Sequence, residues 1–319
     1  MTEEISPYFT NLGSTNIKIS PMGIGTWAWG DRIFWNYGRD HQETDIPPTV
    51  DVLKENGINF IDTAEVYGKG KSERLVGKYI PSEISDAVIA TKFFPFPWRL
   101  TKKALIRNVQ NSLKRLQLAK VSLYQMHFPY PPVSIETWAE ALQESVQRGL
   151  IAAIGVSNYD SKQMLRMQSA LIKYGLMLAS NQVPYSLLDR KIEKDGLLEL
   201  CREHRITLIA YSPLAQGMLT GKYSSENPPN GFRARRYSAR KLDEIQYIVR
   251  TMRNIGQDHK GKSPAQVALN WVMAKGAIPI PGAKNARQAQ DNAGALGWQL
   301  SIDEVAALDA ASDRAMAVS

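Results

Sequence analysis

Four residues able to move or stabilise protons follow three short apolar runs of the chain. Asp62 ends the first run with Tyr67 just beyond it, Lys92 ends the second run, and His127 ends the third. A carbonyl that receives a hydride needs a proton donor, and the charge that develops on its oxygen needs electrostatic stabilisation. These four residue types can supply both functions if the fold brings them to one place.

Each of the four suggests a distinct role. A tyrosine has a pKa of about 10 and exchanges protons poorly near neutral pH, but an adjacent ammonium lowers this pKa. We therefore expect Lys92 to lower the pKa of Tyr67, the proton donor. Asp62 would hold Lys92 in place and keep it charged. His127 would orient the carbonyl oxygen by donating a hydrogen bond.

Taken singly, most of these residues have simpler interpretations. Asp62 could form a turn, Tyr67 could pack at a loop, and His127 could be a structural histidine. Lys92 is harder to explain in this way, because the run AVIAT before it is entirely apolar and would carry the ammonium into a partly buried place. The presence of all four together favours the catalytic interpretation.

The elements that would position these residues alternate along the chain. Strands are predicted at residues 22–26, 58–62, 87–92, 121–127, 152–157, 179–183, 206–212 and 277–282. Amphipathic stretches with helical spacing include 101–116, 136–149 and 161–175. A strand followed by a helix or long loop, eight times over, is typical of an α/β (β/α)8 TIM barrel, whose active sites lie at the C-terminal ends of the strands. An open doubly wound sheet is the alternative.

No linker, repeat or low-complexity tract divides the chain, so residues 1–319 are expected to form a single barrel domain. The segment 12–20 reads as a β-hairpin that could close the barrel floor. A long loop rich in proline, glycine and arginine is expected at 224–241, after the seventh strand. Its basic part, 228–241, carries Arg233, Arg235, Arg236 and Arg240. These arginines could attract an acidic substrate, cover cofactor phosphates, or simply be solvated.

The composition narrows the class of protein. The net charge is +8, but the basic residues are scattered, which does not favour nucleic-acid binding. Cys201 is the only cysteine, so an internal disulfide and a thiolate metal site are ruled out, and a metal site is not expected. Neither a leader nor a membrane-spanning run of about 18 apolar residues is evident. We expect a cytoplasmic protein that acts on a small-molecule carbonyl substrate; its oligomeric state stays open, and a monomer is plausible.

Hydride chemistry implies a nucleotide cofactor. The stretch Gly23–Ala28 matches GxGxxA, but the aromatic sequence after it does not resemble a helix, so we do not read it as a Rossmann fingerprint. Ser157, Asn158, Gln182 and Tyr211 follow or end later strands and could hold a nicotinamide. Small residues in 211–223 suit a pyrophosphate. The stretch 280–292 leads into a helix whose N-terminus could bind an anionic group of the cofactor. Its cations, Lys284 and Arg287, favour NADPH/NADP+ over NAD(H).

Together these stretches resemble the aldo-keto reductase family. FIDTAEVYG, ATKF, LYQMH, GVSNY, NQVPYSLL, AYSPLAQGMLTGKY and IPGAKN are similar to that family's signatures and stand in its usual order over nearly the whole chain. The chain looks most like the bacterial and plastid branch, near pyridoxal reductases and potassium-channel β-subunit relatives. The resemblance implies a barrel that binds NADPH without a Rossmann domain, and a catalytic tetrad of Asp62, Tyr67, Lys92 and His127.

The resemblance also implies cofactor contacts, residue by residue. They fall on Thr26, Trp27, Asp62, Ser157, Asn158, Gln182 and Tyr211, on the pyrophosphate residues Ser212, Pro213, Leu214, Gly217, Gly221 and Lys222, and on Pro281, Gly282, Lys284, Gln288 and Asn292 at the adenosine phosphate. The chain departs from the family where many members have Lys-Ser, because it has Gly282-Ala283. Lys284 or Arg287 would have to bind the phosphate instead.

The function expected from these residues is NADPH-dependent reduction of aldehydes, and less readily of ketones. Aromatic residues after the first and third strands are expected at the mouth of the site: Trp27, Trp29, Trp35, Phe93, Phe94, Phe96 and Trp98, with Trp27, Phe93 and Trp98 in the substrate pocket. Two alternatives stay open. One is an NADPH-binding redox sensor with little turnover, and the other is a barrel enzyme that uses Lys92 as a Schiff-base amine.

Overall fold

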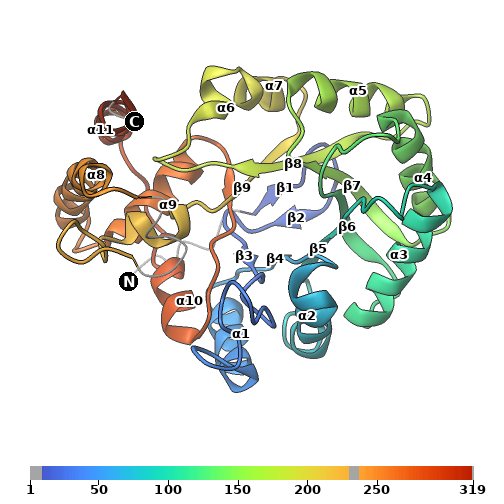
Figure 1. Cartoon of the computed structure of the whole chain (residues 1–319), viewed down its shortest axis with the longest axis horizontal. Coiled ribbons are helices and arrows are strands. Elements are labelled where there is room, and N and C mark those ends of the chain that lie inside the picture. The colour runs from blue at the N-terminus through green and yellow to red at the C-terminus, as the bar shows by residue number, and fades with distance from the viewer. Residues whose placement is uncertain (1–8, 230–236, 318–319) are drawn as a thin grey trace, which may run out of the picture.

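The structure, a computed structural model, describes residues 9–229 and 237–317. Within them, eight parallel strands form a barrel surrounded by helices (Figure 1). The strands are β3 (Ile24–Gly25), β4 (Phe60–Asp62), β5 (Val88–Phe93), β6 (Val121–Met126), β7 (Ile151–Ser157), β8 (Leu178–Pro184), β9 (Thr207–Tyr211) and β10 (Ile278–Pro279). A parallel bridge between Gly25 and Gly282 joins the first segment to the last. The (β/α)8 barrel predicted from the alternation is therefore confirmed.

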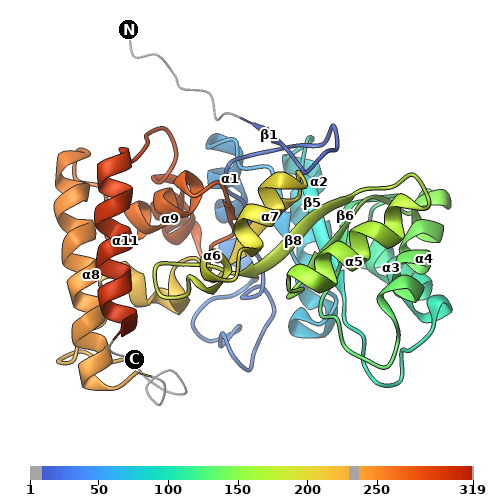
Figure 2. The same ribbon diagram turned by 90° about the horizontal axis from the view of Figure 1, so that it is seen from above.

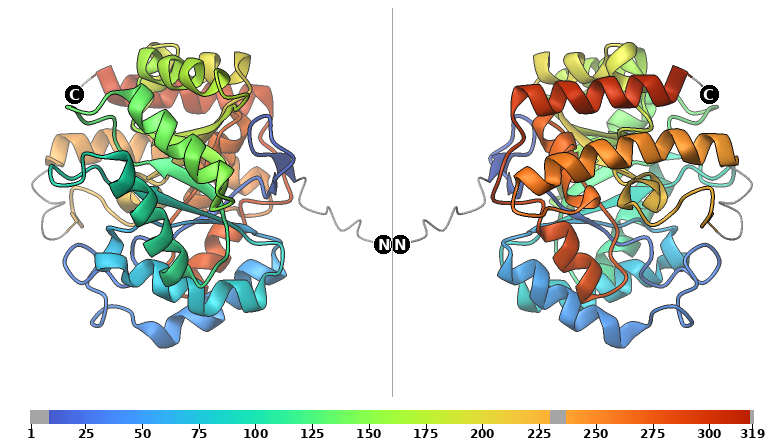
Figure 3. Two further views of the ribbon diagram at one scale, coloured as in Figure 1. Left: turned by 90° about the vertical axis from the view of Figure 1, so that its right-hand side faces the viewer. Right: turned by 90° about the vertical axis from the view of Figure 1, so that its left-hand side faces the viewer.

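Helices and short helical turns connect the strands and cover the outside of the barrel. They are η1 (Glu43–Asp45), α1 (Ile46–Glu55), η2 (Tyr67–Gly70), α2 (Lys71–Glu83), α3 (Lys102–Leu116), α4 (Ile135–Gln147), α5 (Ser161–Ile172), α6 (Lys191–Lys194), α7 (Leu197–Glu203), η3 (Ala215–Thr220), α8 (Ala239–Asp258), α9 (Pro264–Ala274), α10 (Ala286–Ala293) and α11 (Ile302–Ala317). Helices α8 and α11 lie side by side on the outside of the ring (Figures 2 and 3).

Helix α3 shows why these segments become helices. The side chains of Leu105, Val109, Leu113 and Leu116 recur on one face, and all four are buried against the barrel. The hydroxyl of Thr101 accepts a hydrogen bond from the Ala104 amide and caps the first turn. The amphipathic pattern therefore positions the helix, and burial of its apolar face holds it there.

The interior of the barrel has its own apolar core beneath the site. It contains inward-facing strand residues such as Phe60, Leu123 and Ile209, together with Leu12 and Ile19. Both residues belong to a hairpin formed by β1 (Thr10–Asn11) and β2 (Lys18–Ile19), which lies at one end of the barrel in Figure 3. The predicted hairpin is confirmed, and its apolar side chains close the floor of the barrel.

Strand register brings the polar residues into one layer near the other end. Lys92 pairs with Gln125, Gln125 with Gly155, and Gly155 with Ser180. A Cβ atom added to Gly155 would lie 2.4 Å from Ser180 Oγ and 2.8 Å from Gln125 Cγ. Glycine therefore makes room for two inward polar side chains that face the Lys92 layer.

Two expectations about individual residues require correction. Phe93 was expected in the substrate pocket, but it is fully buried and its ring packs against Trp138 of α4 at 5.4 Å. Successive side chains of a strand point to opposite faces, so an inward Lys92 directs Phe93 outward. Arg240 was expected in a loop, but it lies in α8. Arg233, Arg235 and Arg236 lie outside the described residues.

Among the described residues, the helices are all too short or too polar to cross a membrane.

Candidate active site

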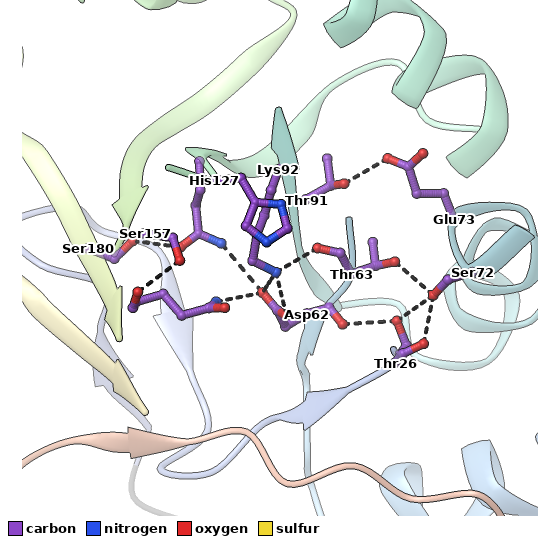
Figure 4. Close-up of polar contacts among 12 residues, drawn as sticks. Thr26, Asp62, Thr63, Ser72, Glu73, Thr91, Lys92, His127, Ser157 and Ser180 are labelled. Carbon is purple, nitrogen blue, oxygen red and sulfur yellow. Dashed lines mark hydrogen bonds and ion pairs between the residues drawn. The ribbon is translucent and has the colours of Figure 1, made fainter. Parts of the chain in front are cut away.

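Asp62 and Lys92 form a buried pair of opposite charges inside the barrel (Figure 4). Lys92 Nζ donates to Asp62 Oδ1 at 2.8 Å and Oδ2 at 2.6 Å, and to the carbonyl oxygen of Thr63 at 2.8 Å. The exposed fraction of the side chain is 0% for Lys92 and 2% for Asp62. Burial lowers the pKa of Lys92, while the Asp62 carboxylate opposes this shift. The pair is thus fixed in geometry and shielded from water.

Asp62 also accepts hydrogen bonds from two carboxamides. Gln182 Nε2 donates to Asp62 Oδ1 at 2.7 Å, and Gln125 Nε2 lies 3.4 Å from the same oxygen. Sequence reasoning named Gln182 as a nicotinamide contact and missed Gln125. The signal for Gln125 was the alternation along β6, which places Leu123 and Gln125 on the inner face.

Tyr67 begins the short turn η2 and faces the other members of the set. Lys92 Nζ lies 5.2 Å from the centroid of the Tyr67 ring, and the ring of Trp27 stacks on it with centroids 5.8 Å apart. The turn is pressed against the β3–α1 loop, because a Cβ on Gly68 would lie 2.6 Å from the carbonyl oxygen of Gly30. Glycine at 68, with φ of 54°, therefore lets the Tyr67 turn approach this loop.

The protonation of Tyr67 differs from the sequence-based expectation. Burial raises the pKa of Tyr67 well above its ordinary value, and the charge on Asp62 raises it further. The ammonium of Lys92 was expected to lower this pKa. Because both carboxylate oxygens of Asp62 contact that ammonium, the pair exerts little net positive field on the phenol. The Tyr67 phenol is therefore protonated at neutral pH.

His127 lies beside Tyr67 at the end of β6. The two rings meet edge to face with centroids 6.1 Å apart, and Phe128 stacks on the imidazole at 5.1 Å. Burial, and secondarily the charge on Lys92, lowers the pKa of His127 to about 3. Its Nδ1 is buried and has no hydrogen-bond partner among the residues that the structure describes. A neutral imidazole at this position can donate a hydrogen bond but carries no charge.

The residues expected at the nicotinamide form a connected group on β7–β9. Asn158 Nδ2 donates to the carbonyl of His127 at 3.0 Å and to Ser157 Oγ at 3.1 Å, and Tyr211 Oη donates to Asn158 Oδ1 at 3.0 Å. Ser157 Oγ donates to the carbonyl of Gln182 at 2.8 Å. These side chains are therefore brought together beside His127, and they hold one another in place.

Of the residues expected at the adenosine phosphate, some are held by hydrogen bonds within the protein, whereas Arg287 is exposed to solvent. Gln288 Oε1 accepts from the Lys284 amide at 2.9 Å, and Asn292 Nδ2 donates to the carbonyl of Gly282 at 3.3 Å. Lys284 Nζ donates to the Trp35 carbonyl at 3.1 Å and lies 3.5 Å from Asp40 Oδ2. Arg287, in the first turn of α10, is exposed. Lys284 is thus engaged by the β3–α1 loop, whereas the guanidinium of Arg287 faces solvent.

The stretch after β9 has an unusual backbone. Ser212, Gln216, Gly217 and Gly221 have φ angles of 52°, 56°, 95° and 78°. Pro213 and Leu214 lie inside this stretch, and Lys222 at its end is exposed, with its Nζ 5.5 Å from the Tyr223 ring centroid. Gly217 and Gly282 are open: an added Cβ would have its nearest neighbour 3.7 Å away in each case. This rim therefore leaves backbone accessible beside cationic side chains, an arrangement that fits an anionic dinucleotide.

Thr26 does not occupy the position expected of a cofactor contact. Its side chain is fully buried, and its hydroxyl donates to the Asp62 carbonyl at 2.9 Å. The Thr26 amide donates to the same carbonyl, and its own carbonyl accepts from Ser72 and Trp29. Every polar group of Thr26 is therefore used within the protein, which corrects the expectation for this residue.

The mouth is lined by aromatic side chains of three loops. Phe94 contacts the rings of Phe96, Phe128, Tyr130 and His127 at centroid distances of 4.4–6.0 Å. Trp98, 74% exposed, stacks on Phe96 at 4.8 Å, and Phe34 stacks on Trp27 at 4.9 Å.

Two further residues near the mouth have structural contacts. Trp29, also expected at the mouth, is instead fully buried, with Nε1 donating to the Ala283 carbonyl at 3.0 Å. Glu65, which sequence reasoning missed, accepts from the Phe94 amide and from Arg99, both at 2.8 Å. Glu65 therefore attaches the β5–α3 loop to the β4–α2 loop that carries Tyr67.

The fold and the polar group at the C-terminal strand ends are those of a barrel enzyme. The model of the Aldo/keto reductase family matches residues 21–313. The chain therefore belongs to the aldo/keto reductase family and is an oxidoreductase, as its motifs indicated.

Related proteins support this assignment. The chain is 38% identical over 309 residues to pyridoxal reductase, chloroplastic, of Arabidopsis thaliana, covering 93% of this chain and 84% of that protein. It is 32% identical over 311 residues to aldo-keto reductase YhdN of Bacillus subtilis, covering 93% and 91%.

Solved structures share the architecture. The glycerol dehydrogenase AKR11B4 of Gluconobacter oxydans superposes with a TM-score of 0.84 at 28% identity, over 97% of this chain and 96% of that one. An aldo/keto reductase of Klebsiella pneumoniae in complex with NADP and acetate gives a TM-score of 0.72 at 29% identity, with 94% of each chain covered.

Proposed function

We propose that the protein reduces aldehydes to alcohols with NADPH, and that Tyr67 donates the proton. The observation that carries the proposal is the placement of Tyr67 between an aromatic mouth and a buried ion pair. Its ring lies 5.8 Å from Trp27 on one side, and Lys92 Nζ lies 5.2 Å from it on the other. Ketones are expected to react less readily.

In this proposal the substrate carbonyl oxygen lies between Tyr67 and His127. His127, kept neutral by its low pKa, donates a hydrogen bond that orients the oxygen. Bound NADPH supplies the hydride. Tyr67 gives its proton to the oxygen as negative charge develops there, because a protonated phenol of high pKa remains a donor throughout the neutral range. The phenolate that would result faces the Asp62–Lys92 pair, whose ammonium lies 5.2 Å from the ring centroid and whose carboxylate offsets most of the positive field.

The rim on β7–β10 would hold the cofactor. Ser157, Asn158, Gln182 and Tyr211 are proposed at the nicotinamide end. The open backbone at Gly217 and Gly282 suits the phosphates, with Lys222 nearby. Gln288 and Asn292 are proposed to support the Gly282–Lys284 segment rather than to bind the phosphate themselves. Because Lys284 is engaged by Trp35 and Asp40, we assign the 2′-phosphate to Arg287.

The aromatic mouth suits flat aldehydes. Trp27, Phe94 and Trp98 offer ring faces or edges to a planar substrate, which gains from stacking and from burial of apolar area. Pyridoxal, after which the Arabidopsis relative is named, is a flat aromatic aldehyde and is the first candidate.

The Schiff-base alternative is disfavoured by geometry. Lys92 Nζ donates to three oxygens and its side chain has no exposed surface. A nucleophilic amine needs a free lone pair and access to the substrate. Asp62 favours the ammonium form, so Lys92 suits an electrostatic role better.

The test is NADPH oxidation by the purified chain with a panel of aldehydes. Pyridoxal, an aromatic aldehyde and methylglyoxal span flat and small substrates. Turnover that is highest with the flat aldehydes, and weaker with NADH than with NADPH, supports the proposal. Tight NADPH binding without turnover on any aldehyde would instead indicate the redox-sensor alternative.

Three accompanying proposals follow from the sequence. We propose that residues 1–319 form one barrel domain and that the protein works in a reducing compartment such as the cytoplasm, which its lone cysteine favours. Size-exclusion chromatography with light scattering would determine the oligomeric state, for which a monomer is the starting hypothesis.

A further inference from the structure

Three fully buried hydroxyl side chains, Thr26, Thr63 and Ser72, meet behind the Asp62–Lys92 pair (Figure 4). Ser72 Oγ lies 2.8 Å from Thr26 Oγ1 and 2.9 Å from Thr63 Oγ1. Thr26 directly follows β3, Thr63 directly follows β4, and Ser72 lies in the first turn of α2. The cluster therefore joins two strand ends to the helix that follows the Tyr67 turn.

The acceptors around the cluster determine the direction of each hydrogen bond. Ser72 Oγ donates to the Thr26 carbonyl at 2.8 Å, and Thr26 Oγ1 donates to the Asp62 carbonyl at 2.9 Å. Each hydroxyl has one proton, so the Thr63 hydroxyl must donate to Ser72 Oγ. Without Ser72 Oγ, the buried Thr63 hydroxyl would lose its acceptor.

Both hydrogen-bond partners of Ser72, Thr26 and Thr63, contact the backbone or side chains of the Asp62–Lys92 pair. The Thr63 carbonyl accepts from Lys92 Nζ at 2.8 Å, and the Thr63 amide donates to the Ala90 carbonyl at 2.9 Å. Thr26 contacts the Asp62 carbonyl with its amide and its hydroxyl, both at 2.9 Å. The cluster thus holds the backbone of Asp62 and of Thr63, which together supply every hydrogen-bond acceptor found for Lys92 Nζ among the described residues.

Glu73, the residue after Ser72, attaches the first turn of α2 to a third strand, β5. Glu73 is fully buried, and its carboxylate accepts from Thr91 Oγ1 at 2.7 Å and from Arg115 Nε. Thr91 precedes Lys92 in β5. The first turn of α2 is therefore bonded through side chains to the ends of β3, β4 and β5, and it begins directly after the turn that starts at Tyr67.

We propose that Ser72 is a positioning residue for the reductase reaction: through Thr63 and Thr26 it sets the placement of Lys92 and Asp62 relative to Tyr67. Ser72 is remote from substrate and acts only through these neighbours. The inference rests on the proposed function, because the roles of Tyr67 and Lys92 belong to that proposal. It extends the site to a residue that the sequence motifs alone did not single out.

The kinetic test compares Ser72→Ala with Ser312→Ala. Ser312 is also a fully buried serine that donates to a carbonyl, that of Leu187 at 2.6 Å, but it lies in α11. Misplacement of catalytic groups by a fraction of an ångström lowers kcat, so Ser72→Ala should lose about tenfold in kcat. The KM for aldehyde and the Kd for NADPH should stay within about twofold. Ser312→Ala should keep the native kcat.

A second pair of variants covers the case in which Ser72→Ala does not fold. Thr63→Val removes the hydroxyl that bonds to Ser72, and Thr63→Ser retains it. The valine variant should show the loss of kcat, and the serine variant should restore it. In the valine variant the alkaline limb of the kcat profile should also move to lower pH, because a displaced Thr63 carbonyl stabilises the Lys92 ammonium less well.

Urea unfolding of Ser72→Ala, Thr63→Val and the double variant measures the energetic coupling between Ser72 and Thr63 independently of catalysis. Non-additive losses of stability are expected, since both substitutions remove the same hydrogen bond. Additive losses would overturn the inference, as would a native kcat in Ser72→Ala or an unshifted pH profile in Thr63→Val. Absence of NADPH turnover by the native chain would overturn the proposed function instead, so the two failures are distinguishable.

Discussion

The two halves of the barrel rim are built differently. On the β3–β6 half, Asp62 and Lys92 are buried and bonded to each other, and Lys92 also donates to the Thr63 carbonyl. On the β7–β10 half, the backbone after β9 has positive φ angles and the cations Lys222 and Arg287 are exposed. The contrast indicates that contacts within the protein fix the proposed proton-transfer groups, whereas the proposed cofactor rim exposes its cationic groups to solvent.

The largest effect is expected from breaking the buried pair. Lys92→Met leaves the Asp62 carboxylate buried without its cation and should cost about 3–5 kcal/mol of unfolding free energy, measured by urea denaturation. Adding Asp62→Asn should recover part of this loss. Lys222→Met on the opposite half should leave stability unchanged. Equal losses for Lys92→Met and Lys222→Met would remove the distinction between the halves.

The second effect is a loss of stability in acid, and the lowered pKa of His127 determines its direction. The unfolded chain protonates this histidine near its ordinary pKa of 6.5, but the folded chain does so only near 3. The unfolded state therefore binds more protons between these values, and stability falls as pH drops from about 6.5 to about 3. We expect this group to contribute on the order of 5 kcal/mol to that fall, since a difference of one in pKa between the two states corresponds to about 1.4 kcal/mol.

Unfolding free energies measured at pH 7 and pH 4 check the contribution of His127. His127→Gln should lose less stability on acidification than the native chain does. His204→Gln, a substitution of an exposed histidine away from the site, should lose as much as the native chain. An unchanged acid sensitivity in His127→Gln would show that the imidazole is not the group responsible.

A smaller effect is expected from the open half. Arg287→Ala should weaken NADPH binding about tenfold, in the range of a charge-assisted hydrogen bond, and leave NADH binding unchanged. Quenching of tryptophan fluorescence would report both affinities. Lys284→Ala is the matched variant, and its loss should be smaller because Lys284 already contacts Asp40 and the Trp35 carbonyl. The reverse order would assign the phosphate to Lys284.

The smallest effect is expected at the mouth. Trp98 is 74% exposed and stacks on Phe96, so Trp98→Ala should leave the melting temperature nearly unchanged. The KM for a flat aromatic aldehyde should rise about threefold, in the range of one aromatic contact. The KM for a small aliphatic aldehyde serves as the control, and an equal rise for both would argue against stacking.

The strand ends that carry the proposed catalytic residues were predictable from the sequence because their apolar runs stop at a polar residue. Lys92 after AVIAT and His127 after the β6 run were located in this way. Phe93 was misassigned because the inward and outward alternation was not continued past Lys92. The helical state of Arg240 was hidden by the turn-forming residues that precede α8.

Contacts between distant segments were harder to predict. The pKa of Tyr67 was misjudged because the bidentate contact between Asp62 and Lys92, which neutralises the ammonium, depends on the exact register of β4 and β5. Gln125 and Ser72 are polar residues with no distinctive spacing, and their partners lie 63 residues (Asp62) and 46 residues (Thr26) away in the sequence. Such pairings become visible only when the barrel has closed.

The most direct test of the account is the comparison of Tyr67→Phe with the native chain in NADPH-dependent reduction of an aromatic aldehyde. We predict that kcat falls by about 10²–10⁴-fold, the usual contribution of a general acid, while the Kd for NADPH and the melting temperature stay close to native. Retention of native kcat by Tyr67→Phe would contradict the assignment of Tyr67 as proton donor.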